Sequence, residues 1–163
     1  MPDRELYDLA ERAGRALEKC GWMVATAESC TGGWVAEAIT MIPGSSAWFD
    51  RGFVTYTKDA KAELLGIERD LLDQNDAVSE AIARAMAEGA LSRSEADIAI
   101  AVTGFAGPAG PNCEEGLVHF ALARRGQPTQ HREEHFGAIG RGAVRVKSLK
   151  TLLEMLERAL QGE

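Results

Sequence analysis

The sequence is poor in the features that mark several protein classes. It has three cysteines (Cys20, Cys30 and Cys113) and no CxxC pair, so reduced thiols are expected and not a disulfide framework. No apolar run approaches the roughly 20 residues of a membrane span. Basic residues are outnumbered, 18 against 25 acidic ones, which gives a formal net charge of −7 and a pI near 5.1. Because nucleic-acid binding needs a basic face, no nucleic-acid partner is expected.

The N-terminus, Met-Pro-Asp-Arg-Glu, has no signal-peptide character, which predicts a cytoplasmic protein. The 163 residues are 45% hydrophobic and contain neither an internal repeat nor a linker. A chain of this length can bury a substantial core. We therefore expect one domain over residues 1–163.

Helices and strands are predicted to alternate along the chain. Apolar periodicity indicates helices over 3–20, 33–42, 58–65, 79–91 and 140–160. Buried strands are predicted over 22–26, 52–56 and 97–102, and the segments 116–123 and 129–136 resemble a hairpin. This order predicts the α/β class, as a three-layer α/β/α sandwich around a mixed β-sheet.

The segment Ala27–Gly33 reads Ala-Glu-Ser-Cys-Thr-Gly-Gly and lies where the first strand turns into a helix. Backbone N–H groups at a helix start are unpaired, so such a turn suits an anion or a nucleophile. A tight turn with Thr31 as the helix N-cap explains the local sequence equally well.

The stretch His131-Arg-Glu-Glu-His135 matches the HxxEH pattern of inverted zinc peptidases. Chelation at that spacing requires a helix, but this stretch has no apolar helical face. As a strand it would separate the two imidazoles by roughly 13 Å. We therefore expect an exposed strand edge and no metal.

A glycine-rich loop follows the predicted strand 97–102, with Gly104, Gly107 and Gly110 three residues apart. It lacks the Gly-Lys-Ser/Thr of a P-loop, and no helix follows it directly, so neither a nucleoside triphosphate nor NAD is indicated. Open α/β sheets nevertheless bind ligands at this position. A ligand loop and a simple connection both remain open.

The apolar stripe of the last helix runs backwards into Arg145 and Arg141. A guanidinium group on the apolar side of a helix requires an anion. An internal salt bridge would satisfy that need, and so would a carboxylate or phosphate ligand near the helix N-terminus.

Tyr56 and Lys61 follow the second predicted strand. A lysine in a short helix is usually solvated, but a serine that attacks an amide needs a base, and no histidine lies in a convincing motif. Desolvation or nearby positive charge can lower a lysine pKa enough for that role. A tyrosine hydroxyl could relay the proton.

Six motifs in order resemble one known family: Ala27–Gly33, Pro43-Gly-Ser-Ser46, Val54-x-Tyr56-x4-Lys61, Ala77-Val-Ser79, Thr103-Gly-x-Ala-Gly-Pro108 and Arg141-x3-Arg145. From about residue 5 to 160 the chain resembles the CinA C-terminal family, the nicotinamide mononucleotide deamidases, in its stand-alone form. The resemblance implies hydrolysis of nicotinamide mononucleotide to nicotinic acid mononucleotide and ammonia, a pyridine-nucleotide recycling step. It also implies an α/β/α fold, no metal or other cofactor, and a homodimer.

The resemblance assigns roles to particular residues. Ser29 is the expected nucleophile, Lys61 its base and Tyr56 an assisting group, with Cys30 or Ser46 as the next candidates for nucleophile. N–H groups at the start of helix 32–42 are expected to stabilise the oxyanion, and Arg145 the 5′-phosphate. The expected substrate-binding positions are Glu28, Thr31, Gly32, Ser45, Ser46, Thr103, Gly104, Ala106, Gly107, Arg141 and Arg145. Whether Glu28 is a catalytic partner, a ligand contact or an acceptor that holds the turn stays open.

The chain departs from the family pattern in two places. Lys58 stands where the family usually has Asn, and Asn112–Glu115 carries two acids where a basic residue is usual. Acids beside the ligand loop motivate two alternatives: a nucleotide-binding regulatory module without chemistry, or a hydrolase of another small amide.

Overall fold

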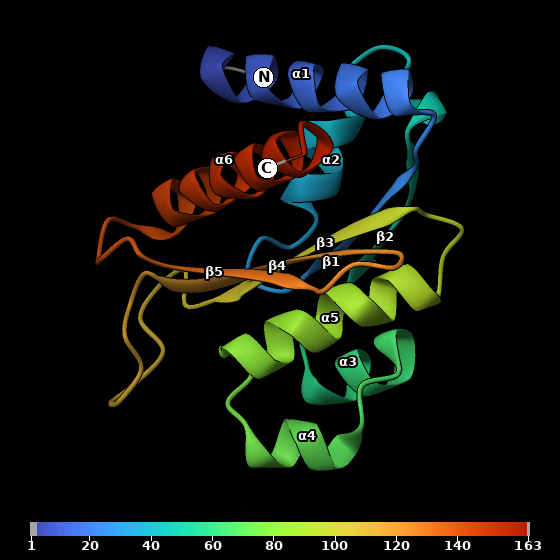
Figure 1. Ribbon diagram of the computed structural model, residues 1–163. Coiled ribbons are helices and arrows are strands. Elements are labelled where there is room, and N and C mark those ends of the chain that lie inside the picture. The colour runs from blue at the N-terminus through green and yellow to red at the C-terminus, as the bar shows by residue number, and fades with distance from the viewer. Residues whose placement is uncertain (1–2, 163) are drawn as a thin grey trace.

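The computed structural model describes residues 3–162, which form one mixed sheet between two layers of helices (Figure 1). The helices are α1 (Arg4–Cys20), α2 (Trp34–Thr40), α3 (Lys58–Leu65), α4 (Arg69–Gln74), α5 (Glu80–Ser92) and α6 (Arg141–Leu160), with a short 3₁₀ turn, η1, at Ser45–Ala47. The strands are β1 (Val24–Glu28), β2 (Phe49–Val54), β3 (Ile98–Gly104), β4 (Leu117–Arg124) and β5 (Gln130–His135). The predicted three-layer α/β/α architecture is confirmed.

The sheet has the strand order β2-β1-β3-β4-β5. β1 pairs in parallel with both β2 and β3, whereas β4 and β5 are antiparallel to their neighbours and form the predicted hairpin. The parallel strands β1 and β3 therefore end side by side at one edge. In open α/β sheets ligands bind outside that carboxyl edge.

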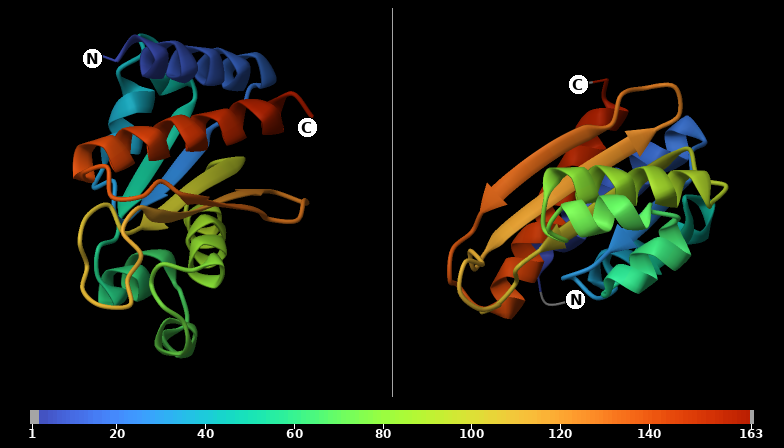
Figure 2. Two further views of the ribbon diagram at one scale, coloured as in Figure 1. Left: turned by 90° about the vertical axis from the view of Figure 1, so that its left-hand side faces the viewer. Right: turned by 90° about the horizontal axis from the view of Figure 1, so that it is seen from below.

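The two faces of the sheet are covered by different helices. The upper face in Figure 1 lies under α1, α2 and α6, and the lower face lies on α5, with α3 and α4 beyond it. Seen from below, the hairpin of β4 and β5 extends past the helices of the lower layer (Figure 2). Each face buries its own apolar cluster, so the core is divided by the sheet.

Local sequence signals explain most element boundaries. Asp3, Thr57 and Ser79 accept backbone hydrogen bonds as N-caps of α1, α3 and α5. Gly21 and Gly66 end α1 and α3 in the left-handed conformation. These three helices lie within one or two residues of their predicted bounds.

The strands differ more from prediction. β1 continues to Glu28, and β3 continues through Thr103 and Gly104 because both residues still pair with β4. β2 begins and ends earlier than residues 52–56, so Tyr56 lies in the connection to α3. Within residues 3–162, no helix is both long and apolar enough to cross a membrane.

Candidate active site

Ser29 and Lys61 meet at the carboxyl edge of the sheet. Ser29 follows the last residue of β1, and Lys61 lies in the second turn of α3. Lys61 Nζ is 3.2 Å from Ser29 Oγ and donates a 2.8 Å hydrogen bond to the Thr55 carbonyl oxygen. A hydroxyl and an amine at this separation have the geometry of a nucleophile and its base.

Burial changes the acidity of the Lys61 ammonium group. The side chain is 1% exposed, and no carboxylate pairs with it among the described residues. Desolvation therefore lowers the pKa of Lys61 below its ordinary value of 10.5. A lowered pKa raises the fraction of neutral amine, which is the form that can accept the serine proton.

Of the three roles considered for Glu28, the structure shows the third: its carboxylate is the hydrogen-bond acceptor that holds the turn. Its carboxylate accepts hydrogen bonds from Thr31 Oγ1 (2.6 Å) and from the backbone N–H groups of Gly33, Val35 and Ala36. It is fully buried, and four donors together with the N-terminus of α2 stabilise its charge.

Two predictions about this turn are wrong for the same reason. Gly33, with φ of 107°, is the N-cap of α2, and Thr31 does not cap the helix because its hydroxyl donates to Glu28. The N–H groups at the start of α2 are occupied by Glu28, so they cannot form the expected oxyanion site. By contrast, the N–H groups of Cys30 and Thr31 donate to no acceptor in another residue of the described chain.

Cys30 is a poor nucleophile in this setting. Its side chain is buried in the upper cluster, and burial raises the pKa of the thiol to about 12, with Arg145 opposing the rise. The thiol therefore stays protonated near neutral pH, whereas the thiolate is the reactive form.

A cavity of about 280 Å³ opens beside Ser29 and Lys61. Its lining includes Tyr56 and Thr103, the loop residues from Gly104 to Ala109, and Arg141. This volume is near the lower end for sites that bind small molecules. The predicted positions Ser29, Lys61, Tyr56, Thr103, Gly104, Ala106, Gly107 and Arg141 thus line one cavity.

The two arginines of α6 have different surroundings. Arg141 is exposed at the cavity, where its guanidinium lies so close to Gly107 that a Cβ there would be 2.8 Å from Nη2. Arg145 donates to the Cys30 carbonyl oxygen at 2.9 Å and lies over the Trp34 ring. Neither pairs with a carboxylate in the described chain, so the internal salt bridge considered above is not formed.

Two predicted groups take other positions. Ser45 and Ser46 lie in η1, directly before β2, and since β2 runs parallel to β1 they are at the opposite sheet edge from Ser29. Within one chain they do not reach this cavity. Tyr56 is 58% exposed at the cavity rim, and its hydroxyl makes no hydrogen bond to Ser29 or Lys61.

The CinA C-terminal domain model matches residues 6–160 of the chain. The chain is 48% identical over 159 residues to "Nicotinamide-nucleotide amidohydrolase PncC" of Escherichia coli K12, covering 96% of this chain and 95% of the relative. It is 46% identical to the protein of that name from Enterobacter agglomerans, covering 94% and 96% of the two chains. The crystal structure of the competence/damage inducible protein CihA from Agrobacterium tumefaciens superposes with a TM-score of 0.94 at 47% identity, covering 99% and 98%.

The chain belongs to the CinA C-terminal domain family. The family resemblance in the sequence is therefore confirmed, and so is the fold that it implied.

The departure from the family pattern at residues 112–115 lies outside the lining of the cavity. The Glu114 carboxylate is hydrogen-bonded to His135 on β5, so this acid is held against the hairpin. The loop itself extends to the same side of the sheet as α3 (Figure 2). Residues 112–115 therefore contribute no side chain to the cavity lining.

Sequence reasoning missed three contributors to the site. The Thr55 carbonyl oxygen orients Lys61, and Ala77 and Val78 line the cavity. The Ala77 carbonyl oxygen also accepts a 2.8 Å hydrogen bond from Thr103 Oγ1. Ala77 and Val78 belong to one of the six family motifs, so the sequence could have indicated them. Thr55 acts through its backbone carbonyl oxygen, which every residue has, so its identity could not indicate the role.

Proposed function

We propose that this protein hydrolyses the carboxamide of nicotinamide mononucleotide, yielding nicotinic acid mononucleotide and ammonia. The observation that carries the proposal is the buried pair of Lys61 Nζ and Ser29 Oγ, 3.2 Å apart at the end of a cavity. Family membership and the name of the relatives, nicotinamide-nucleotide amidohydrolase, support the substrate class.

Ser29 and Lys61 perform the covalent chemistry. Neutral Lys61 takes the hydroxyl proton as Ser29 Oγ bonds to the carboxamide carbon, whose π electrons move to oxygen. When this tetrahedral intermediate collapses, Lys61 returns the proton to the leaving nitrogen, and ammonia departs. Water then attacks the ester carbon and gives a proton to Lys61, which passes it to Ser29 Oγ as the bond between Oγ and the carbonyl carbon breaks. The carboxylic acid that is released loses its remaining proton to solvent and becomes the carboxylate product.

The backbone N–H groups of Cys30 and Thr31 stabilise the oxyanion. They belong to the same turn as Ser29, and both are free of other acceptors in the described chain. Arg145 stabilises this turn by donating a hydrogen bond to the Cys30 carbonyl oxygen. Preorganised donors of this kind lower the barrier without reorganisation during the reaction.

Arg141, and not Arg145 as the family resemblance implied, binds the 5′-phosphate, because Arg141 lines the cavity and Arg145 does not. Its guanidinium is exposed and lacks a carboxylate partner in the described chain, and it lies against the glycine loop. An arginine and a phosphate form strong charge-assisted hydrogen bonds. Tyr56 at the rim and Thr103 in the wall contact the nucleoside, so remote binding energy positions the amide at Ser29.

Several properties stay predictions for this chain: a single amidase domain over the whole chain, a homodimer, a cytoplasmic location, no metal in the reaction and no nucleic-acid partner. Sedimentation equilibrium on the purified protein would check the dimer.

A panel of substrates tests the proposed activity. Purified protein is incubated with nicotinamide mononucleotide, nicotinamide riboside, free nicotinamide and simple aliphatic amides, and ammonia is measured. We expect the mononucleotide to give the highest kcat/KM. Ammonia from another amide alone would favour the small-amide hydrolase, and binding of the mononucleotide without ammonia would favour the regulatory module.

A further inference from the structure

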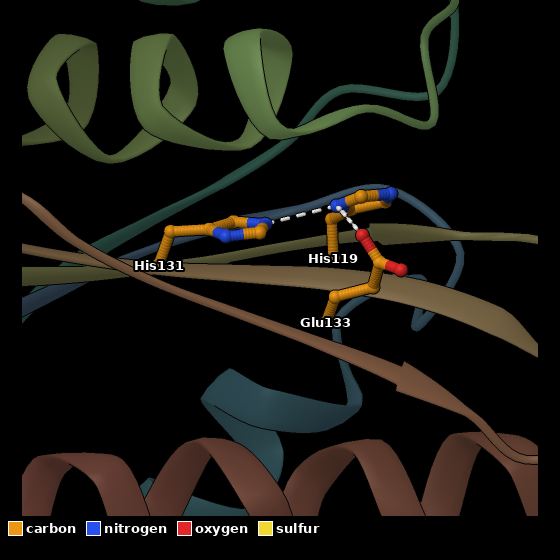
Figure 3. A group of neighbouring side chains, drawn as sticks. All are labelled: His119, His131 and Glu133. Carbon is orange, nitrogen blue, oxygen red and sulfur yellow. Dashed lines mark hydrogen bonds and ion pairs between the residues drawn. The ribbon is translucent and has the colours of Figure 1, made fainter.

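Two histidines and a glutamate gather on the lower face of the hairpin, outside the proposed catalytic groups (Figure 3). His119 comes from β4, and His131 and Glu133 come from β5. Alternate residues of a strand share a face, so His131 and Glu133 point the same way, and His119 is the cross-strand partner of Glu133. Because this segment is a strand, His131 lies beside His119 of the neighbouring strand.

The ligand atoms of this cluster have the spacing of a metal site. His119 Nδ1 is 2.9 Å from His131 Nε2 and 3.8 Å from Glu133 Oε1, and the three ligand atoms lie within 4.8 Å of one another. Two ligands about 2.0–2.1 Å from a tetrahedral zinc ion are roughly 3.3 Å apart. Both distances from His119 Nδ1 are within about half an ångström of that separation, so a small adjustment of His131 and Glu133 would bring the three atoms around one ion.

The surroundings of the cluster match those of metal-binding histidines. Glu80 Oε1 lies 3.6 Å from Nδ1 of His131, the ring nitrogen opposite the one that faces His119, and Arg84 holds Glu80 in place. A carboxylate behind an imidazole orients the ring and raises its basicity as a ligand. On the other side, Glu133 Oε2 is 2.7 Å from His135 Nε2, which fixes the carboxylate.

The two imidazole side chains are largely buried, which favours metal binding. The side chain of His119 is only 8% exposed and that of His131 12%, so little ordering of the imidazoles is required. Two histidines and one carboxylate suit Zn²⁺ and similar divalent transition metals, with one coordination position left open.

We propose that His119, His131 and Glu133 form a binding site for a divalent transition metal such as Zn²⁺. The ion would cross-link β4 to β5 beside the cavity, because His119 is the cross-strand partner of Thr103. None of the three ligands is Ser29, Lys61 or Arg141, so the proposal is independent of the amidase chemistry.

Metal titration of matched variants tests the site. Cys20 and Cys113 are first replaced by serine, because accessible thiols also bind Zn²⁺. Co²⁺ binding is followed by its visible absorption and Zn²⁺ binding by calorimetry. We expect one equivalent to bind, and His119→Gln or His131→Gln to weaken binding by at least about 100-fold.

A pair of neighbouring glutamates provides the control for charge and folding. Glu133→Gln should weaken binding, whereas Glu134→Gln, on the opposite face of the same strand, should leave it unchanged. Zn²⁺ at about 100-fold excess over its Kd should raise the Tm of the unsubstituted protein by about 5–10 °C and leave that of His119→Gln unchanged. No metal binding by the parent protein, or equal binding by His119→Gln, His131→Gln and the parent, would overturn the proposal.

Discussion

The two faces of the sheet use the same strands for different purposes. Toward α1, α2 and α6 the three inner strands present large apolar side chains: Val24, Ile98, Ile100, Val102, Val118, Phe120 and Leu122. Toward α5 the buried apolar side chains of these strands are all alanine: Ala25, Ala27, Ala99, Ala101, Ala121 and Ala123. Large buried side chains contribute most of the hydrophobic stabilisation, whereas alanines contribute little and let a helix approach closely.

The alanine face is also the face that carries the polar groups. Continuing its alternation past the alanines gives Ser29 after β1, Thr103 at the end of β3 and His119 near the start of β4. Glu28, one residue before Ser29, instead points to the large-residue side and holds the N-terminus of α2. We infer that the upper face supplies stability and the lower face supplies chemistry.

After loss of the nucleophile itself, the largest expected effect at the active site comes from Lys61→Met. This change keeps the buried volume but removes the base, so kcat for ammonia release should fall by about 10²–10⁴-fold. Lys58 is an exposed lysine of the same helix, so the control variant Lys58→Met should leave kcat unchanged. Equal losses in the two variants would contradict a specific role for Lys61.

The pH dependence of the unsubstituted protein reports on the same lysine. Protonated Lys61 cannot accept the serine proton, so kcat/KM should rise with pH as Lys61 loses its proton. Because burial lowers the pKa, the rise should level off below pH 10.5, the pKa of an ordinary lysine. A kcat/KM that falls with increasing pH below 10.5 would contradict the assignment of Lys61 as the base.

On the stability face, Leu122→Ala should act on folding and not on catalysis. Leu122 is fully buried, so the free energy of unfolding should fall by about 2–5 kcal/mol in urea titration. Ammonia release per folded molecule should stay close to that of the parent. A large loss of kcat at temperatures where the variant is folded would mean that the faces are not separable in this way.

A smaller effect is expected from Arg141→Ala, at the rim of the cavity. Loss of the phosphate contact should raise KM for nicotinamide mononucleotide by about 10–100-fold. The same change should have little effect with nicotinamide riboside, which lacks the phosphate. Arg158→Ala, at the other end of α6, is the matched control, and a similar rise there would point to general charge and not to a phosphate site.

Residue patterns predicted the fold well because its signals are local. Caps at Asp3, Thr57 and Ser79 and the unbroken apolar run of β3 define elements without reference to the rest of the chain. The antiparallel hairpin was equally visible from its polar turn. What local signals could not give was the length of strands whose last residues are polar, as in β1 and β3.

The site was only partly predictable for a related reason. Lys61 looks like a solvated lysine in its helix, and only the tertiary fold buries it beside Ser29. The family resemblance implied that Ser45 and Ser46 contact the substrate, but they precede β2, which runs parallel to β1, so they lie at the other edge of the sheet from Ser29. The difference between Arg141 and Arg145 depends on which neighbour each side chain meets.

The central claim is that Ser29 is the nucleophile, and ammonia release by the Ser29→Ala variant tests this claim most directly. The change removes one oxygen, and Ser92→Ala at the end of α5 is the matched control. With nicotinamide mononucleotide, Ser29→Ala should lower kcat by at least about 10³-fold while its unfolding transition stays close to that of the parent and Ser92→Ala keeps full activity. Parental kcat in folded Ser29→Ala would contradict the account.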